Sequence, residues 1–109
     1  MLNRLLVTGV DDGVPPAPQA RLKQNAPNPF NPDTKIRFDL TTAMKVRLAI
    51  HDVQGRLVAT LVNGWLPAGD HQVSWTGRGR DNRAIASGVY FYSLEGEHLR
   101  LSRRMVLLK

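Results

Sequence analysis

The residues of this sequence that could do chemistry are three histidines, two short acidic clusters and fifteen lysine or arginine side chains. His51, His71 and His98 lie far apart, without the close spacing that would bring two of them onto one zinc ion. Asp11-Asp12-Gly13 and Asp81-Asn82 resemble fragments of calcium-binding loops, but neither supplies the further carboxylates that such a loop requires. Ordinary turn chemistry explains both clusters, so we predict no metal site.

The sequence also lacks the residues that usually carry out nucleophilic catalysis. No serine lies in the sharp strand-to-helix turn of a nucleophile elbow, and the chain contains no cysteine. The absence of cysteine further excludes disulfides and thiolate metal ligands, so the core must be held by packing alone. We expect a protein that is not an enzyme, with no catalytic residues and no cofactor.

The positive charge raises the possibility of a nucleic-acid partner. Fifteen basic against nine acidic residues give a formal net charge of +6. Nucleic-acid modules concentrate Lys and Arg on one face and interleave aromatic side chains that stack on bases. Here the basic residues are spread over several predicted strands, whereas Phe38, Trp75 and Phe91 lie on the predicted apolar faces of their strands. We therefore predict no nucleic-acid partner and interpret most of the charge as a solvated face.

Two stretches near the middle of the chain predict the unit around which the fold is organised. His71–Thr76 alternates apolar and polar side chains, which is typical of a half-buried strand. Val89–Leu94 begins with four strand-forming residues in succession, so we expect both of its faces to be covered. Glycines and Asp81-Asn82 in the connection tolerate positive φ. These features predict a strand, a corner and a second strand, with large aromatic anchors at the corner.

Four further segments have strand patterns, namely Thr34–Leu40, Lys45–Asp52, Arg56–Asn63 and His98–Leu108. In the first two, the residues predicted to face inward are Ile36, Phe38, Leu40, Val46, Leu48 and Ile50, and those predicted outward in the second are Arg47, Ala49 and His51. About six or seven strands at spacings of roughly 10 residues, with no helical pattern, predict an all-β fold. An immunoglobulin-like antiparallel β-sandwich of about seven strands is favoured, and a small barrel is the alternative.

The chain divides into two parts. Residues 1–21 are predicted to be an N-terminal extension and Pro-rich linker, in which Val10–Ala20 favours an extended spacer. A linker normally follows another domain, so we expect the chain to be the tail of a longer polypeptide. Residues 22–109 are predicted to be the folded domain. Within it, Asn25–Asp33 holds three prolines and is expected to form a rigid loop that places Phe30 in the end of the core.

Several motifs, in order and in register, carry a family resemblance over about residues 22–109. They are Gln24–Pro32 (QNAPNPFNP) followed by Thr34 and Ile36, then Val46–Ile50 with Asp52, Gly55 and Arg56, Gly69–His71 leading to Trp75 and Gly77, Ser87–Tyr92, and the closing Arg104–Lys109. This pattern resembles the type A C-terminal sorting domain of the type IX (Por) secretion system. That family is related to the immunoglobulin-like domain of flagellar hook-capping proteins. The motif residues expected to be structural are Asn28, Pro29, Phe30, Asn31, Pro32, Asp52, Gly55, Trp75, Gly77, Gly88 and Tyr90.

The resemblance implies a non-catalytic C-terminal module fused to an upstream, enzymatic cargo. Such cargo crosses the periplasm, is recognised by the outer-membrane secretion translocon through this domain, and is secreted or attached to lipopolysaccharide at the cell surface. The last strand, presented as a sheet edge, is the expected recognition element, namely Arg104, Met105, Val106, Leu107, Leu108 and Lys109. The simpler interpretation, compatible with the first, is that this strand completes the sheet and buries Met105 and Leu107.

A second function remains open. The domain could be a structural or carbohydrate-binding β-sandwich appended to a secreted glycoside hydrolase, with an exposed Trp65 between turns stacking on a sugar. Core or edge packing of Trp65 is the competing interpretation. Tyr90, which follows Gly88 at the corner, is expected to fold its hydroxyl back onto nearby backbone, as in immunoglobulin tyrosine corners.

Overall fold

The computed structural model describes residues 19–109, and these residues form seven strands and no helix. The predicted extension, most of the Pro-rich linker and Asp11-Asp12-Gly13 lie outside the described residues. No helix able to cross a membrane occurs within the described range. The first strand of the described range begins at Ala20, two residues before the predicted start of the domain.

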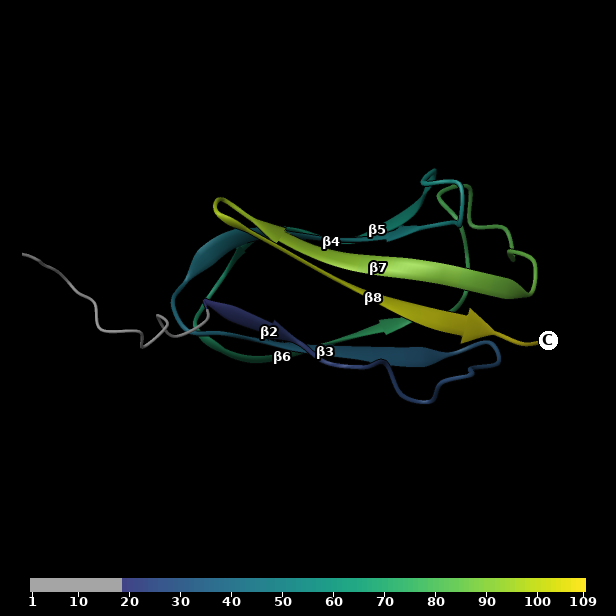
Figure 1. The fold of residues 1–109 in the computed structure, drawn as a ribbon, viewed down its shortest axis with the longest axis horizontal. Coiled ribbons are helices and arrows are strands. Elements are labelled where there is room, and N and C mark those ends of the chain that lie inside the picture. Colours follow the sequence, from purple (N-terminus) through teal and green to yellow (C-terminus); the bar gives the residue numbers. More distant parts are fainter. Residues whose placement is uncertain (1–18) are drawn as a thin grey trace, which may run out of the picture.

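The strands form two antiparallel sheets that lie one above the other (Figure 1). The three-stranded sheet has the order β2 (Ala20–Leu22), β3 (Thr34–Leu40) and β6 (Gly69–Trp75). The four-stranded sheet has the order β5 (Leu57–Leu66), β4 (Met44–His51), β7 (Gly88–Gly96) and β8 (Leu99–Leu107). The prediction of an immunoglobulin-like antiparallel sandwich of about seven strands is confirmed.

The core lies between the two sheets and follows the alternation of each strand. All six residues predicted to face inward on β3 and β4 are at most 3% exposed. From the four-stranded sheet, Tyr92, Leu94, Met105 and Leu107 are fully buried as well. At roughly 25 cal/mol per Å² of apolar surface, each such side chain stabilises the fold by about 1.5–3 kcal/mol.

Three details of the predicted pattern are wrong. Ala49 was expected to face solvent, yet it is 0% exposed, because its single methyl group lies low between the rows of longer side chains, Arg47–Glu95 and His51–Phe91, on the outer face. Phe91 is 37% exposed, so the outer face of β7 is not fully covered. β5 continues past the predicted end at Asn63 to Leu66, which places Trp65 within a strand and not between turns.

The connection from β6 to β7 crosses from one sheet to the other, and large aromatic side chains pack at this corner. The Trp75 ring lies 6.3 Å from Tyr90 and 5.7 Å from Phe30, measured between ring centroids. The Tyr90 hydroxyl donates a 2.7 Å hydrogen bond to the carbonyl of Ala86, as predicted for a tyrosine corner. Gly77 has a φ of +71° and its Cα faces the Pro32 carbonyl, so a side chain there would be both strained and crowded.

Candidate functional site

The end of β8 carries the predicted recognition residues, and its side chains alternate between core and solvent. Met105 and Leu107 are 0% exposed and complete the core. Arg104, Leu108 and Lys109 point to solvent, and Leu108 is 53% exposed. The inner edge of this segment pairs with β7, where Met105 lies opposite Tyr90. The simpler interpretation is therefore confirmed for Met105 and Leu107, and recognition through the solvent-facing side chains stays a prediction.

The outer edge of this segment is covered by residues 24–30, which we call the covering loop. The Gln24 side chain donates to the Arg104 carbonyl at 2.8 Å, and the Val106 N–H donates to Asn28 Oδ1 at 3.0 Å. The Phe30 N–H donates to the Val106 carbonyl at 2.9 Å, and the Leu108 N–H donates to the Phe30 carbonyl at 3.0 Å. β8 is the edge strand of its sheet, as expected, but the outer backbone groups from Arg104 to Leu108 are already paired with the covering loop and are not open to a partner.

A buried polar network attaches the covering loop to the core. The Asn25 N–H donates to the Tyr92 hydroxyl at 2.8 Å, and that hydroxyl donates to the Lys23 carbonyl at 2.7 Å. The Asn25 side chain donates to Thr34 Oγ1 at 2.9 Å and to the Pro27 carbonyl at 3.1 Å. Asn25 and Thr34 are among the few buried polar residues. The network holds the loop in one geometry, because an unpaired group there would lose its hydrogen bond without regaining water.

Replacing Tyr92 by phenylalanine is expected to destabilise the fold by about 1–3 kcal/mol, since the buried Asn25 N–H and the Lys23 carbonyl each lose a partner. Burial raises the pKa of Tyr92 above its ordinary value of 10.0, an effect that the Asn25 N–H partly opposes. Above pH 10 the unfolded chain releases this proton while the folded chain retains it, so wild-type stability falls.

Urea unfolding at neutral pH and above pH 10 measures both effects. The difference in free energy of unfolding between the wild type and the Tyr92→Phe variant should become smaller with rising pH, because the variant has no hydroxyl to ionise at this position. A difference that stays constant above pH 10 would contradict the assigned role of burial.

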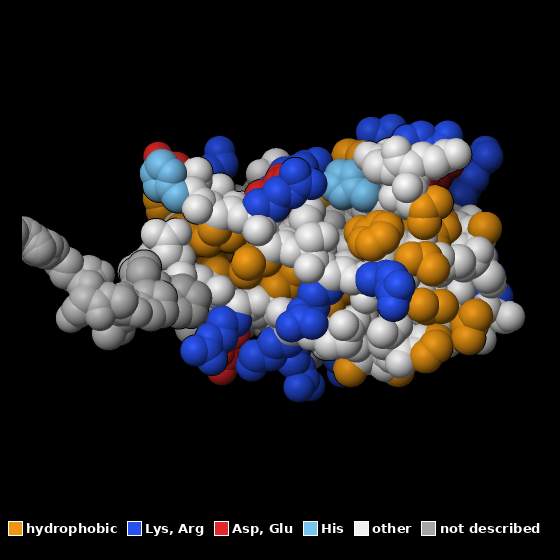
Figure 2. Space-filling model, viewed as in Figure 1, with side chains coloured by type: hydrophobic (Ala, Val, Ile, Leu, Met, Phe, Trp, Pro, Cys, Tyr) orange, Lys and Arg blue, Asp and Glu red, His pale blue; other side chains and the backbone are white. Residues whose placement is uncertain are grey.

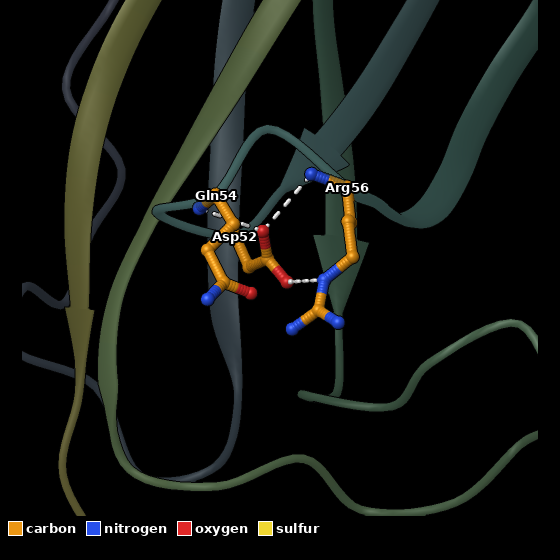
Figure 3. A network of polar contacts seen from close by, with 3 residues as sticks. All are labelled: Asp52, Gln54 and Arg56. Atoms are coloured by element: carbon orange, nitrogen blue, oxygen red, sulfur yellow. Dashed lines mark hydrogen bonds and ion pairs between the residues drawn. The ribbon is translucent and has the colours of Figure 1, made fainter.

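The family-motif residues Asp52 and Gly55 lie in the hairpin between β4 and β5. Figure 3 shows Asp52 with its partners Gln54 and Arg56. Asp52 Oδ1 accepts from the N–H groups of Gln54 and Arg56, both at 2.9 Å, and Oδ2 accepts from the Arg56 side chain at 3.0 Å. Gly55 adopts the predicted left-handed conformation, with a φ of +83°. These contacts, above all the Arg56 N–H, lower the pKa of Asp52 below 3.8. The carboxylate is fully engaged in shaping the turn.

Replacing Asp52 by asparagine is expected to lower the melting temperature at neutral pH, because the ion pair and one strong acceptor are lost. Since the folded pKa of Asp52 is depressed, its contribution is present above pH 3.8 and disappears as the pH falls through the folded value. Thermal unfolding between about pH 2 and pH 7 tests this. The two melting temperatures should converge in acid, and equal melting temperatures at neutral pH would refute the assignment.

The remaining titratable residues do not converge on one site. No group of three His, Cys, Asp or Glu side chains that could hold a metal occurs among residues 19–109. His71 stacks on Phe38 at 5.3 Å, and its ring nitrogen lies 2.8 Å from the Pro67 carbonyl. On the face shown in Figure 2, basic side chains gather in groups near the upper and lower margins, and uncharged and apolar surface lies between the groups. This distribution does not form the continuous basic stripe that a nucleic-acid strand requires.

Exposed aromatic surface is concentrated at Trp65, which is 73% exposed. Trp65 lies opposite Lys45 on the outer face of the four-stranded sheet. It lines a depression of about 590 Å³ together with Arg47 and Asn63. The site can therefore offer an aromatic face flanked by hydrogen-bond donors.

Comparison with known protein families identifies the family of this chain. The FlgD Ig-like domain family matches residues 24–98, which contain the covering loop, the Asp52 hairpin and the corner. The chain belongs to this family. No curated protein matches the chain.

Two solved structures from Porphyromonas gingivalis share the fold of this FlgD Ig-like domain. PorZ, described as an essential bacterial surface component of the type IX secretion system, is 24% identical with a TM-score of 0.57 over 79% of this chain. Dimeric latent PorU is 19% identical with a TM-score of 0.66 over 93% of this chain. The aligned region covers only 11% of the PorZ chain and 10% of the PorU chain. At these identities the likeness establishes the fold alone.

Proposed function

We propose that this FlgD Ig-like domain is a non-catalytic C-terminal module that directs an upstream protein through the type IX secretion system and attaches it to the cell surface. The observation that carries the proposal is the end of β8. Its core-facing side chains are buried and its outer backbone edge is covered, while Arg104, Leu108 and Lys109 project into solvent. An exposed apolar side chain between two cations is suited to recognition by a partner surface.

The closed backbone edge refines the proposed mode of recognition. Strand addition would require at least four hydrogen bonds from the covering loop to β8 to be broken first. Recognition of the exposed side chains needs no such opening. The translocon is therefore proposed to bind Arg104, Leu108 and Lys109 on a folded domain. The likeness to domains within PorZ and PorU supports this assignment, as do the motifs shared with C-terminal sorting domains.

The test uses the precursor that carries this chain at its C-terminus, in a bacterium with a type IX system. Replacing Arg104 and Lys109 by glutamate and Leu108 by serine should reduce surface display of the cargo by about tenfold or more, equivalent to 1.4 kcal/mol of lost recognition. The matched control replaces Lys35 and Arg37, two exposed cations on the other sheet, by glutamate. Undiminished display of the first variant, with the domain still folded, would refute the proposal.

Trp65 supports a second candidate, binding of carbohydrate. Its 73% exposure and the adjoining depression of about 590 Å³ are suited to stacking on a sugar ring. The chain should then sediment with an insoluble polysaccharide, and Trp65→Ala should abolish that binding. Lys35→Ala is the control, because Lys35 is exposed on the other sheet and lies outside the Trp65 depression. Equal retention of the wild type and the Trp65 variant would eliminate this function.

A further inference from the structure

A row of small side chains crosses the outer face of the four-stranded sheet. The register places Ala49 opposite Ser93 and Ser93 opposite Ser102. The neighbouring rows are Arg47–Glu95–Arg100 on one side and His51–Phe91–Arg104 on the other. Because cross-strand neighbours stand side by side, a row of small residues between two rows of long ones leaves a trough. The pocket at this position has a volume of about 280 Å³.

Ser93, on the floor of this trough, is one of the few buried polar residues of the described range. It is 2% exposed, and its hydroxyl has no hydrogen-bond partner among residues 19–109. A buried hydroxyl without a partner costs stability, and alanine would fill the same place without that cost. The core-facing neighbours Tyr92 and Leu94 fix the direction of Ser93 toward the outer face, where it lines the pocket.

The rim of the trough carries an excess of positive charge. Glu95 pairs with Arg47 at 3.3 Å and with Arg100 at 3.4 Å, so two cations surround one carboxylate. Arg100 uses only its Nε in that contact, and its side chain is 69% exposed. Its terminal N–H groups are therefore available to a second acceptor. Asp52, which also borders the pocket, accepts three hydrogen bonds within the hairpin, and its charge is paired with that of Arg56.

We infer that this trough binds a single acidic sugar unit of the uronate type. Each feature of such a unit has a counterpart here. The hydroxyls of Ser93 and Ser102 both donate and accept, as sugar hydroxyls require. The Arg100 guanidinium pairs with the carboxylate, and the part-exposed ring of Phe91 covers the C–H face of the sugar. A volume of about 280 Å³ admits one ring, because larger ligands occupy pockets of roughly 300–1,000 Å³.

Access to the Ser93 hydroxyl requires a side-chain rotation at the rim. Exposed side chains change rotamer within nanoseconds, so Arg100 can move aside and close on the carboxylate after the sugar enters. The residues that line this pocket are shared neither with the Trp65 depression nor with the recognition residues proposed at the end of β8, although the flanking rows reach both through Arg47 and Arg104. The inferred ligand is independent of the proposed sorting role.

The experiment is a titration of the purified chain, followed by amide chemical shifts, with glucuronate, glucose and acetate. Glucuronate should bind with a dissociation constant on the order of 1 mM. Ser93→Ala should weaken its binding about tenfold, and Arg100→Gln should do the same for glucuronate but leave glucose unchanged. Arg21→Gln, which removes an exposed arginine from the other sheet, should have no effect.

A second measurement separates ligand binding from structure. Ser93→Ala should raise the melting temperature of the ligand-free chain by about 2–5 °C, because it removes an unpaired buried hydroxyl. A lower melting temperature would show that the hydroxyl has a structural partner, and the inference would be wrong. It would also be overturned if acetate bound as well as glucuronate, or if the serine and arginine variants bound glucuronate like the wild type.

Discussion

Replacing Phe30 by alanine is expected to destabilise the fold by about 3–5 kcal/mol, the range measured when a buried aromatic side chain is truncated. Phe30 is 1% exposed, and its ring packs against Trp75 at 5.7 Å. The same residue joins the covering loop to β8 through its N–H and its carbonyl. Loss of the ring leaves a cavity and loosens the attachment of the loop. The total free energy of unfolding of a domain of this size is about 5–15 kcal/mol, so the variant is close to the limit at which the domain still folds.

Urea unfolding of the Phe30→Ala variant measures this effect through the midpoint, with the slope as a check on two-state behaviour. Phe30→Leu is the matched control, because it keeps an apolar side chain and should cost less than half as much. Hydrogen exchange at the Leu108 amide reports whether the loop has detached from β8. A cost below about 1 kcal/mol for the alanine variant would show that the loop does not depend on this anchor.

Most strands, and the residues on their inward faces, could be predicted from the sequence. The burial of Ile36 and Leu48 was predictable, because the two-residue period of a strand assigns each residue to a face without knowledge of the neighbouring strands. The pattern fails where burial depends on neighbouring strands. Ala49 is buried on the outer face because of the longer residues around it, and Trp65 lies in a strand whose apolar residues on both faces gave no clear end.

The covering loop shows a different limit. The motif that contains Phe30 was recognisable, and its insertion into the core was predicted correctly. Its backbone partners were not predictable, because the contact between Gln24 and Arg104 joins residues 80 positions apart. β2 was missed because three residues are too short for a period to be visible. Asn25 is a polar residue within a proline-rich motif, and only the packed structure gives it a buried role.

Removing Met105–Lys109 is expected to prevent folding altogether. The deletion takes away Met105 and Leu107, both 0% exposed, and each contributes about 2–5 kcal/mol. It also removes the backbone partners of the covering loop at Val106 and Leu108. The two side chains together contribute about 4–10 kcal/mol, before the lost hydrogen bonds are counted, and a typical domain has a free energy of unfolding of only about 5–15 kcal/mol. Circular dichroism of the shortened chain should show no cooperative thermal transition, whereas a chain lacking only Lys109 should melt like the wild type.

This result determines how secretion experiments on the chain end must be interpreted. A precursor without Met105–Lys109 would fail to reach the surface whether those residues are recognised or only complete the core, since an unfolded domain cannot present any binding site. The exposed residues Arg104, Leu108 and Lys109 can be changed without touching the core, so they alone separate recognition from folding. If the shortened chain instead melted cooperatively within a few degrees of the wild type, Met105 and Leu107 would not be essential to the core. A deletion would then become a direct test of recognition.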